Sequence, residues 1–483
     1  MSSAPAPAAA HPVPRGAWLA LAVVLGAAFM SLLDTTIVNV ALPTIRTSLD
    51  ASESTLSWII SGYALAFGLA LIPAGRLGDR YGHKWVFITG LALFTAESLA
   101  CGLAQNDLQL ITARVVQGLG GGIFFPAVSA FIQLLFPPMA RGKAFAILGA
   151  VIGVSSALGP LVGGLIIQAL GDETGWRWIF AVNLPIGVIV LVAAIALLPS
   201  EAAGKATSND LIGLVLLSGA LVALLVPLIQ GQEEGWPLWT YLSIGGGVLL
   251  VVLFALWERS VASRGKDPLV PPRLFAHAQF AAGTILALVF FAAFTSIFFT
   301  ISLLWQAGLG HTALESGLVS VPFAIGNIIG ASQSDRLAAR LGRAVLAIGV
   351  ALLTIGLTAL FLILLLVPTA DLTNWTLLGP LLVAGLGSGL FIAPNVRFIV
   401  ATVDRSEAGA ASGVIGTMQR VGAAAGIAVI GSVFFGNIGP IAGPADLPAA
   451  FGQAATPALA VSAALALVAF LLVFTLPKRV QLH

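Results

Sequence analysis

The feature that most constrains this chain is a series of long segments without a charged residue. Residues 115–140, 144–171, 211–232, 344–370 and 447–477 contain no Asp, Glu, Lys or Arg. A stretch of about 20 mostly apolar residues is long enough to cross a bilayer as a helix. Only 9% of the 483 residues are charged, against about 25% in an average soluble protein. An all-α polytopic membrane protein is therefore predicted, because lipid offers no partner for an unpaired backbone.

Fourteen segments are predicted to span the membrane. They are 16–41, 54–74, 84–104, 108–131, 143–169, 177–198, 211–230, 238–257, 279–305, 315–333, 344–367, 374–396, 407–435 and 455–476. The first resembles the core of a signal peptide, but it is long enough to span and further spans follow. We interpret it as a retained first helix.

The distribution of Lys and Arg orients these spans, since cytoplasmic loops of membrane proteins are enriched in both. With the N-terminus inside, 18 of the 22 Lys and Arg residues fall in inside segments, and only Arg46 and Arg177 fall outside. An error in the number of spans would invert every later loop and remove this asymmetry. Both termini are therefore predicted to be cytoplasmic, and the chain to lie in the cell membrane.

Three features recur along the chain in the same order. GRLGDRYGHK (75–84) follows the second span, and a looser SDRLAARLGR (334–343) follows the tenth. GLGGGIFFP (118–126) in the fourth span matches GLGSGLFIAP (385–394) in the twelfth, and a basic residue with a small-residue helix follows both. The shift of eight spans predicts two pseudo-symmetric six-helix bundles with two inserted helices, and a substrate site at their interface. Chance similarity between glycine-rich helices is the alternative.

This repeat divides the chain into five parts. They are a cytoplasmic N-terminal tail (1–15), an N-terminal six-helix bundle (16–200), two inserted helices (210–258), a cytoplasmic linker (259–278) and a C-terminal six-helix bundle (279–477).

Asp34 is the single charge between Gly16 and Ile45, in the stretch LDTTIVNVALP. A charge at the bilayer centre costs at least about 2.5 kcal/mol on insertion scales, and such residues usually mark ion or substrate pathways. At a rise of 1.5 Å per residue, Asp34 lies about 27 Å along the first span, in its outer half. We expect this carboxyl group to bind and release protons in a water-filled cavity. A hydrated carboxylate at the outer interface is the alternative.

Three further charges fall at comparable depth. Arg114 is expected to contact Asp34, and Glu97 is a further candidate for proton coupling or substrate binding. Arg420 is singled out by its depth alone. The alternatives are that Arg114 extends to the outer surface and that Glu97 only satisfies a neighbour.

The short connector after the second span combines glycines, basic residues and one acid. Gly75 and Gly82 are expected to allow tight turns, and Asp79 to lie just before the third span, where a helix N-terminus favours a carboxylate. Arg76 and Arg80 would anchor the connector at the inner face. An ordinary basic connector is the alternative, although the orientation rule explains neither the glycines nor the acid.

The fifth span contains small residues four apart, which let helix backbones approach closely. The pairs are Gly149 and Gly153, Gly159 and Gly163, and Pro160 and Gly164. Pro160 removes a hydrogen bond and favours a bend. Such a helix is expected to pack tightly against the opposite half and then separate from it, and static packing is the alternative.

Together these stretches resemble the major facilitator superfamily, specifically its fourteen-span drug:proton antiporter branch. The similar stretches are LDTTIVNVALP, GRLGDRYGHK, ARVVQGLGGG (113–122), ALGPLVGG (157–164) and WRWIFAVNLPIG (176–187), so the resemblance covers essentially the whole chain. It implies that the connector with Asp79 helps to gate the cytoplasmic side, that Asp34 couples protons or recognises cations, and that Arg114 influences proton transfer. It also implies that Pro160 and its glycines favour exchange over leakage. The second connector departs from the pattern, since Asp335 and Gly342 stand seven residues apart rather than three.

The sequence thus predicts a proton-coupled antiporter that exports lipophilic compounds by alternating access, with cationic drugs as one candidate class. An importer of a small metabolite and a dedicated exporter for natural-product self-resistance are the alternatives. The choice of protons over sodium rests on the resemblance. Expected partners are a small-molecule substrate, protons and the bilayer, with the chain as a monomer.

Other classes fit poorly. An enzyme is disfavoured, because the five histidines are scattered without metal-ligand spacing, so no metal or cofactor is expected. A channel is disfavoured, because it would not need two related halves with buried charges of both signs. No GxxxxGK[ST] loop for ATP is present. The single cysteine excludes an internal disulfide, and a net charge of +2 without a basic stripe gives no reason to expect a nucleic-acid partner.

Overall fold

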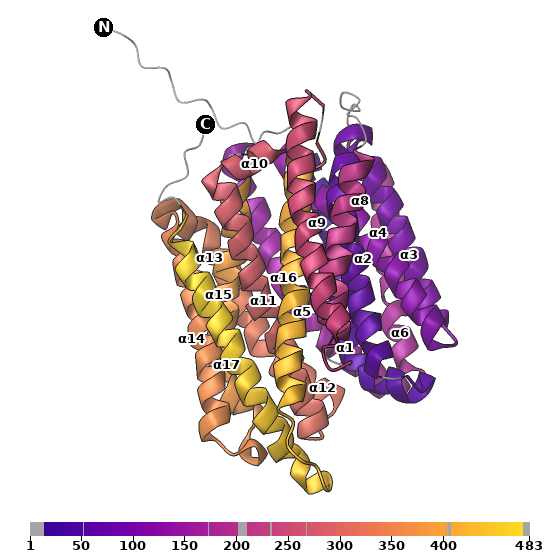
Figure 1. Ribbon diagram of the computed structural model, residues 1–483, viewed down its shortest axis with the longest axis vertical. Helices are drawn as coiled ribbons and strands as arrows, with labels where there is room; N and C mark the ends of the chain where they lie inside the picture. The colour runs from indigo at the N-terminus through magenta and orange to yellow at the C-terminus, as the bar shows by residue number, and fades with distance from the viewer. Residues whose placement is uncertain are drawn as a thin grey trace.

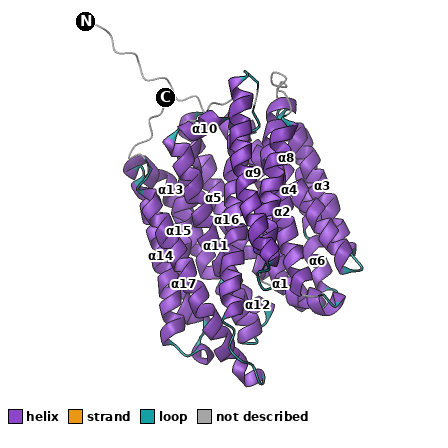
Figure 2. Cartoon of the chain, in the orientation of Figure 1, coloured by secondary structure: helices purple, strands orange, loops and turns teal. Residues whose placement is uncertain are grey.

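The protein is a bundle of long helices in a computed structural model (Figure 1). The structure describes residues 14–476 except 52, 172, 201–209, 232–233, 267, 402 and 404–406. Figure 2 shows only helices and loops in this described part. The predicted tail 1–15 and the segment around Lys205 lie almost entirely outside the described residues.

The first half of the chain forms nine helices within the described ranges. They are α1 (Arg15–Leu49), α2 (Glu53–Tyr81), α3 (His83–Leu103), α4 (Asp107–Leu135), α5 (Pro138–Leu170), α6 (Gly175–Ala181), α7 (Asn183–Leu197), α8 (Leu211–Gln230) and α9 (Leu238–Ser263). The second half contains α10 (Pro272–Ala276), α11 (Ala278–Leu303), the π-helical turn η1 (Leu304–Gly308), α12 (Ala313–Val319), α13 (Val321–Leu341), α14 (Ala344–Leu366), η2 (Thr369–Asp371), α15 (Asn374–Val400), α16 (Ala408–Gly436), η4 (Pro444–Asp446) and α17 (Leu447–Val473).

Among the described residues, 14 helical segments are long and apolar enough to cross a membrane, and each overlaps one predicted span. Two of the predicted spans are each divided into two helices, and neither break was predicted. The sixth is divided into α6 and α7 at Val182, and the tenth into α12 and α13 at Ser320. Each break lies just before a proline, Pro185 and Pro322, which lacks an N–H and clashes with the carbonyl four residues earlier, but fits in the first turn of a new helix.

The repeated glycines have the same structural role in both halves. A Cβ at Gly118 would lie 2.4 Å from the carbonyl oxygen of Tyr63, and one at Gly385 would lie 2.0 Å from that of Phe323. These glycines therefore allow the backbones of α4 and α2, and of α15 and α13, to touch. The next glycines of the repeat, Gly122 and Gly389, are equally close to the following turn of α2 and α13. The glycine repeat in α4 and α15 therefore reflects the same helix packing in both halves.

Two helices join the halves along their length. The fifth span, α5, packs against α12, α13 and α15, and its counterpart α16 packs against α2 and α4. At the end of the bundle where α1 begins and α17 ends (Figure 1), Asp335 forms an ion pair with Arg397 directly against Gly142 of α5. The inserted helices α8 and α9 pack against each other, and α8 also contacts α2 and α16. The inserted pair therefore covers one side of the boundary between the halves.

Candidate functional site

Asp34 lies inside the bundle and is held by three side chains. Its side chain is fully buried, and that of Arg114 is 1% exposed. Arg114 Nη1 donates to Asp34 Oδ2 at 2.6 Å. The other carboxylate oxygen, Oδ1, accepts from Asn183 Nδ2 at 2.7 Å and from Gln117 Nε2 at 3.2 Å. The predicted contact between Asp34 and Arg114 is present, and it excludes both a hydrated carboxylate and an arginine that extends to the surface.

Ser98 completes a network that joins four helices. Its Oγ accepts from Gln117 Nε2 at 2.6 Å and from Asn183 Nδ2 at 3.2 Å. Gln117 in turn accepts from Arg114 Nη1 at 2.6 Å. The carboxylate of α1 is thereby tied to α3, α4 and α7. Buried charges are tolerated only when they are paired and hydrogen-bonded in this way.

Aromatic rings cover the guanidinium of Arg114. Its Cζ lies 4.0 Å from the ring centroid of Tyr63 and 5.7 Å from that of Phe180. Arg114 Nε also donates to the carbonyl of Ile59 at 3.2 Å, and the hydroxyl of Tyr63 lies 3.2 Å from Ser31 Oγ. The charge of Arg114 therefore has partners besides Asp34, so loss of the carboxylate charge would not leave it without contacts.

The sequence analysis did not select three residues of this network, which are Ser98 and the two amides Gln117 and Asn183. Gln117 follows Arg114 by three residues and thus shares its helix face. Asn183 begins α7 directly after the break caused by Pro185. Both amides lie within stretches that resemble the superfamily. However, the sequence does not show which residue an amide in an apolar helix will contact.

We expect Asn183→Ala to lower the free energy of unfolding by about 1–3 kcal/mol, because it removes a buried partner of an ionised carboxylate. Thermal unfolding of the purified protein in detergent measures this effect. Asn437→Ala is the matched control, since Asn437 is exposed and bonds only within its own helix. Equal unfolding temperatures for both variants would contradict the prediction.

Glu97 and Arg420 are not part of this network. Glu97 precedes Ser98 on α3, is half-buried and makes no hydrogen bond or ion pair among the described residues. Arg420 extends from α16, in the other half, and its Cζ lies 3.9 Å from the ring centroid of Phe67 and 5.9 Å from that of Phe125. Of the four charges predicted at similar depth, only Asp34 and Arg114 are brought together.

The connector after the second span is helical, which corrects the expected turn at Gly75. α2 continues to Tyr81, and the chain turns only at Gly82, whose φ of 90° favours glycine. Asp79 therefore lies in the last turn of α2 and not at the start of α3, and its Oδ1 is 3.4 Å from His83 Nε2. The second connector repeats this arrangement, since α13 continues to Leu341 and Gly342 has a φ of 55°.

The two arginines of this connector, Arg76 and Arg80, contact different parts of the chain. Arg76 Nε donates to the carbonyl of Leu269 at 2.8 Å, and its Nη2 bonds the carbonyl of Pro268. Arg76 thus links α2 to the segment that leads into α10. Arg80 lies over the ring of Tyr81, 5.0 Å from its centroid.

The glycines of α5 allow close contact with two different helices, α13 and α1. A Cβ at Gly153 would lie 1.6 Å from Asn327 Oδ1 of α13, across the boundary between the halves. Cβ atoms at Gly159 and Gly163 would instead meet Thr36 and Ile37 of α1, within the same half, at 2.0 and 2.9 Å. The expectation that these glycines face the opposite half is therefore wrong for the second pair. Gly164 is buried as well.

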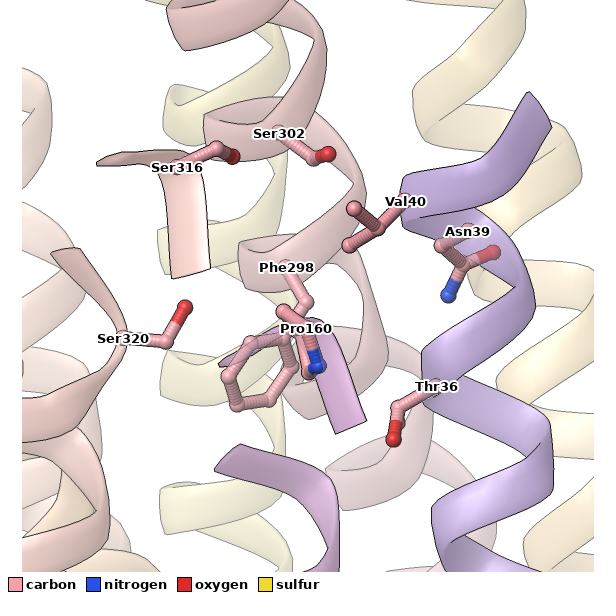
Figure 3. Close-up of a pocket in the computed structure, with 8 residues that line it drawn as sticks. All are labelled: Thr36, Asn39, Val40, Pro160, Phe298, Ser302, Ser316 and Ser320. Carbon is pink, nitrogen blue, oxygen red and sulfur yellow. The ribbon is translucent and has the colours of Figure 1, made fainter. Parts of the chain in front are cut away.

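A narrow pocket lies between the two halves beside Pro160 (Figure 3). Its lining residues come from α1, α5, α11 and the broken tenth span, and they are Thr36, Asn39, Val40, Pro160, Phe298, Ser302, Ser316 and Ser320. Figure 3 shows Pro160 between Phe298 and the α1 residues. The lining is hydroxyl, amide and apolar groups. Asp34 precedes Thr36 by two residues on the same helix, so the pocket and the carboxylate share one rigid element.

A match to a protein-family model identifies the family of this chain. The model described as Major Facilitator Superfamily matches residues 24–427. The chain belongs to the Major Facilitator Superfamily. It is accordingly a multi-pass membrane transporter that binds small-molecule substrates, and not an enzyme.

Individual relatives of this superfamily agree with that assignment. The chain is 39% identical over 432 residues to the probable actinorhodin transporter of Streptomyces coelicolor, covering 87% of this chain and 73% of that protein. It is 32% identical to the tetracenomycin C resistance and export protein of Streptomyces glaucescens, covering 88% and 77%. The fold is similar to that of the proton:xylose symporter XylE, with a TM-score of 0.66 at 14% identity and coverage of 96% and 98%.

Proposed function

We propose that this transporter exports lipophilic compounds in exchange for protons, by alternating access between its two halves. The observation on which the proposal rests is the fully buried carboxylate of Asp34, paired with Arg114. Within the described network it is the one group that changes charge by binding a proton. A proton bound there would neutralise the carboxylate, so the pair provides a protonation site whose state alters packing inside the bundle.

The position of Asp34 on α1 suggests how protonation reaches the cargo. Protonation neutralises the carboxylate and weakens its bond to Arg114, while Arg114 keeps Gln117 and the ring of Tyr63. A change at Asp34 moves α1, which lines the pocket with Thr36 and packs against Gly159 of α5. Since α5 also contacts the other half, proton binding and access to the pocket become linked.

Names of relatives support export over import. One is a probable actinorhodin transporter, and another is a tetracenomycin C resistance and export protein. These names also fit the narrower alternative of a dedicated exporter for a natural product. A proton-coupled importer of a metabolite finds no support in them.

The arrangement in the membrane is part of the proposal. We place both termini in the cytoplasm on the basis of the Lys and Arg distribution, with the cell membrane as location and a monomer as working unit. The bundles keep the boundaries 16–200 and 279–477, with 210–258 as the inserted pair. The connectors with Asp79 and Asp335 then lie at the cytoplasmic entrance and gate it.

Transport in inside-out vesicles tests the proposal. The probes are three planar compounds without a titratable group near neutral pH: anthracene-2-sulfonate, 2-anthramide and (2-anthrylmethyl)trimethylammonium. An acidic lumen should drive accumulation of at least one probe, because protons leave as cargo enters. Nigericin should abolish this accumulation, and vesicles without the protein give the background. A proton-coupled importer would instead lose its probe from an acidic lumen, which would refute the proposal.

A further inference from the structure

Arg420 is a cation inside the bundle without a counter-charge. It extends from α16 between α2 and α4 of the opposite half, where its guanidinium lies over the ring of Phe67 and near that of Phe125. In the described part of the chain it makes neither a hydrogen bond nor an ion pair. The residue as a whole is half-buried, and its guanidinium is covered by these rings.

The neighbouring charges do not compensate Arg420. The carboxylate of Asp34 is fully engaged by Arg114, Gln117 and Asn183, and that pair is neutral as a unit. Glu97 lies on α3, which packs against neither α16 nor any other helix of the second half. The described interior around the boundary therefore has one uncompensated positive charge, which is unfavourable away from water unless an anion pairs with it.

The contact of Arg420 with Phe67 crosses the boundary between the halves. A cation over an aromatic ring is stabilised less than an arginine that binds an acid group through two hydrogen bonds. Phe67 belongs to α2 and Arg420 to α16, so the contact must break when these helices separate. Phe67 therefore contacts the guanidinium while the halves are closed. Once the halves separate, the guanidinium is free to bind an acid group of the cargo.

A row of aromatic side chains continues from Arg420 toward Asp34. The ring centroid of Phe67 lies 5.6 Å from that of Phe125 and 5.8 Å from that of Tyr63. Arg114 lies over Tyr63 just as Arg420 lies over Phe67, so one face of α2 holds an arginine from each half. Phe67 and Tyr63 are buried in this conformation, so planar aromatic cargo would stack on these rings once α2 and α16 separate.

From this geometry we propose that Arg420 selects cargo with an acidic group on a planar aromatic body, such as a sulfonate, carboxylate or phenolate. The planar guanidinium binds the acid group in a fork, and Phe67 and Phe125 contact the aromatic body. The inference rests on the proposed export function and deepens it, and it disfavours the cationic drugs that the sequence analysis named as one candidate class. A cationic compound would meet a like charge in the same place.

Binding to the purified full-length protein in nanodiscs tests this inference with the three anthracene probes, followed by fluorescence anisotropy. We expect the wild-type protein to bind the sulfonate at least about tenfold more tightly than the trimethylammonium, as expected for a charge-assisted hydrogen bond. Arg420→Gln should remove this preference while changing the affinity for 2-anthramide less than about twofold, since the rings remain.

Two further variants keep the result interpretable. Arg420→Lys retains the charge and should retain a preference for the sulfonate, which also addresses any folding defect of the glutamine variant. Arg264→Gln is the matched control, because Arg264 is exposed at the end of α9. The inference is wrong if the preference is absent in the wild type, if it survives Arg420→Gln, if all three probes lose affinity equally, or if no probe binds.

The outcome separates this inference from the export proposal. If an acidic lumen drives accumulation of a probe but charge preference does not depend on Arg420, export stands and the inference fails. If binding shows the Arg420-dependent preference but no pH gradient drives accumulation, the acid-binding site stands and proton-coupled export fails.

Discussion

Asp34→Asn should reduce probe accumulation driven by a pH gradient to the background of vesicles without the protein. Asparagine retains an oxygen that can accept from Asn183 and Gln117, so the shape of the network is nearly kept. It cannot take up a proton, however, and it leaves Arg114 buried without a counter-charge. Removing one partner of a buried ion pair typically costs about 3–5 kcal/mol. The variant should therefore lose both coupling and thermal stability.

A second variant separates these two losses. Asp34→Asn combined with Arg114→Gln removes both charges, so most of the lost stability should return in a thermal unfolding measurement. Transport should not return, because the protonation site is still missing. Asp34 is not the coupling group if the single variant transports at the wild-type rate with its proton flux intact. Recovery of transport in the double variant would lead to the same conclusion.

Gly153→Ala should slow transport by disfavouring the closed contact between α5 and α13. The new methyl group would lie 1.6 Å from Asn327 Oδ1 and 2.1 Å from Asn327 Cγ. Added volume in a packed contact typically costs about 1–3 kcal/mol. Because the clash exists only where the halves meet, this cost falls on one conformation and shifts its population by about 5–150-fold. The measurement is the initial rate of probe accumulation, together with the amount of folded protein.

Shortening the opposing side chain should reverse this effect. Asn327→Ala removes the two closest atoms, so the double variant with Gly153→Ala should transport faster than Gly153→Ala alone. Gly246→Ala on α9 is the matched control, since a Cβ there meets nothing within 4 Å. If Gly153→Ala and Gly246→Ala transport equally well, the contact at Gly153 is not rate-determining.

Much of the fold follows from the sequence, because the bilayer restricts it so strongly. Apolar length sets the number of spans, and each predicted span overlaps one helix of the structure. The boundaries were harder to predict where polar residues continue a helix beyond the apolar core. GRLGDRY reads as a connector because it is charged, yet its backbone stays helical as far as Tyr81. Charged residues show where a helix leaves the apolar part of the membrane, but they do not show where the helix ends. Here the helical conformation ends only at Gly82.

The candidate site was predictable only in part. Asp34 and Arg114 could be found because an isolated charge in an apolar segment is costly and so needs a partner. Gln117, Asn183 and Ser98 gave no comparable signal, since single polar residues that are neutral occur in many membrane helices. The equal depth of Glu97 and Arg420 was misleading as well, because depth along a helix does not fix the direction in which a side chain points.

The sequence alone determined the number of spans, the repeat and the presence of a carboxylate that needs a cation. These properties depend on apolar length, on residue order and on the cost of an isolated charge, all of which are local. The tertiary structure decided which charges meet. Rotation of each helix about its axis turns Ser98 toward Asp34 but leaves Glu97 aside, and it places Arg420 over Phe67 without an acid. That rotation is set by close packing at Gly118, Gly159 and similar contacts between distant segments, and no single segment contains this information.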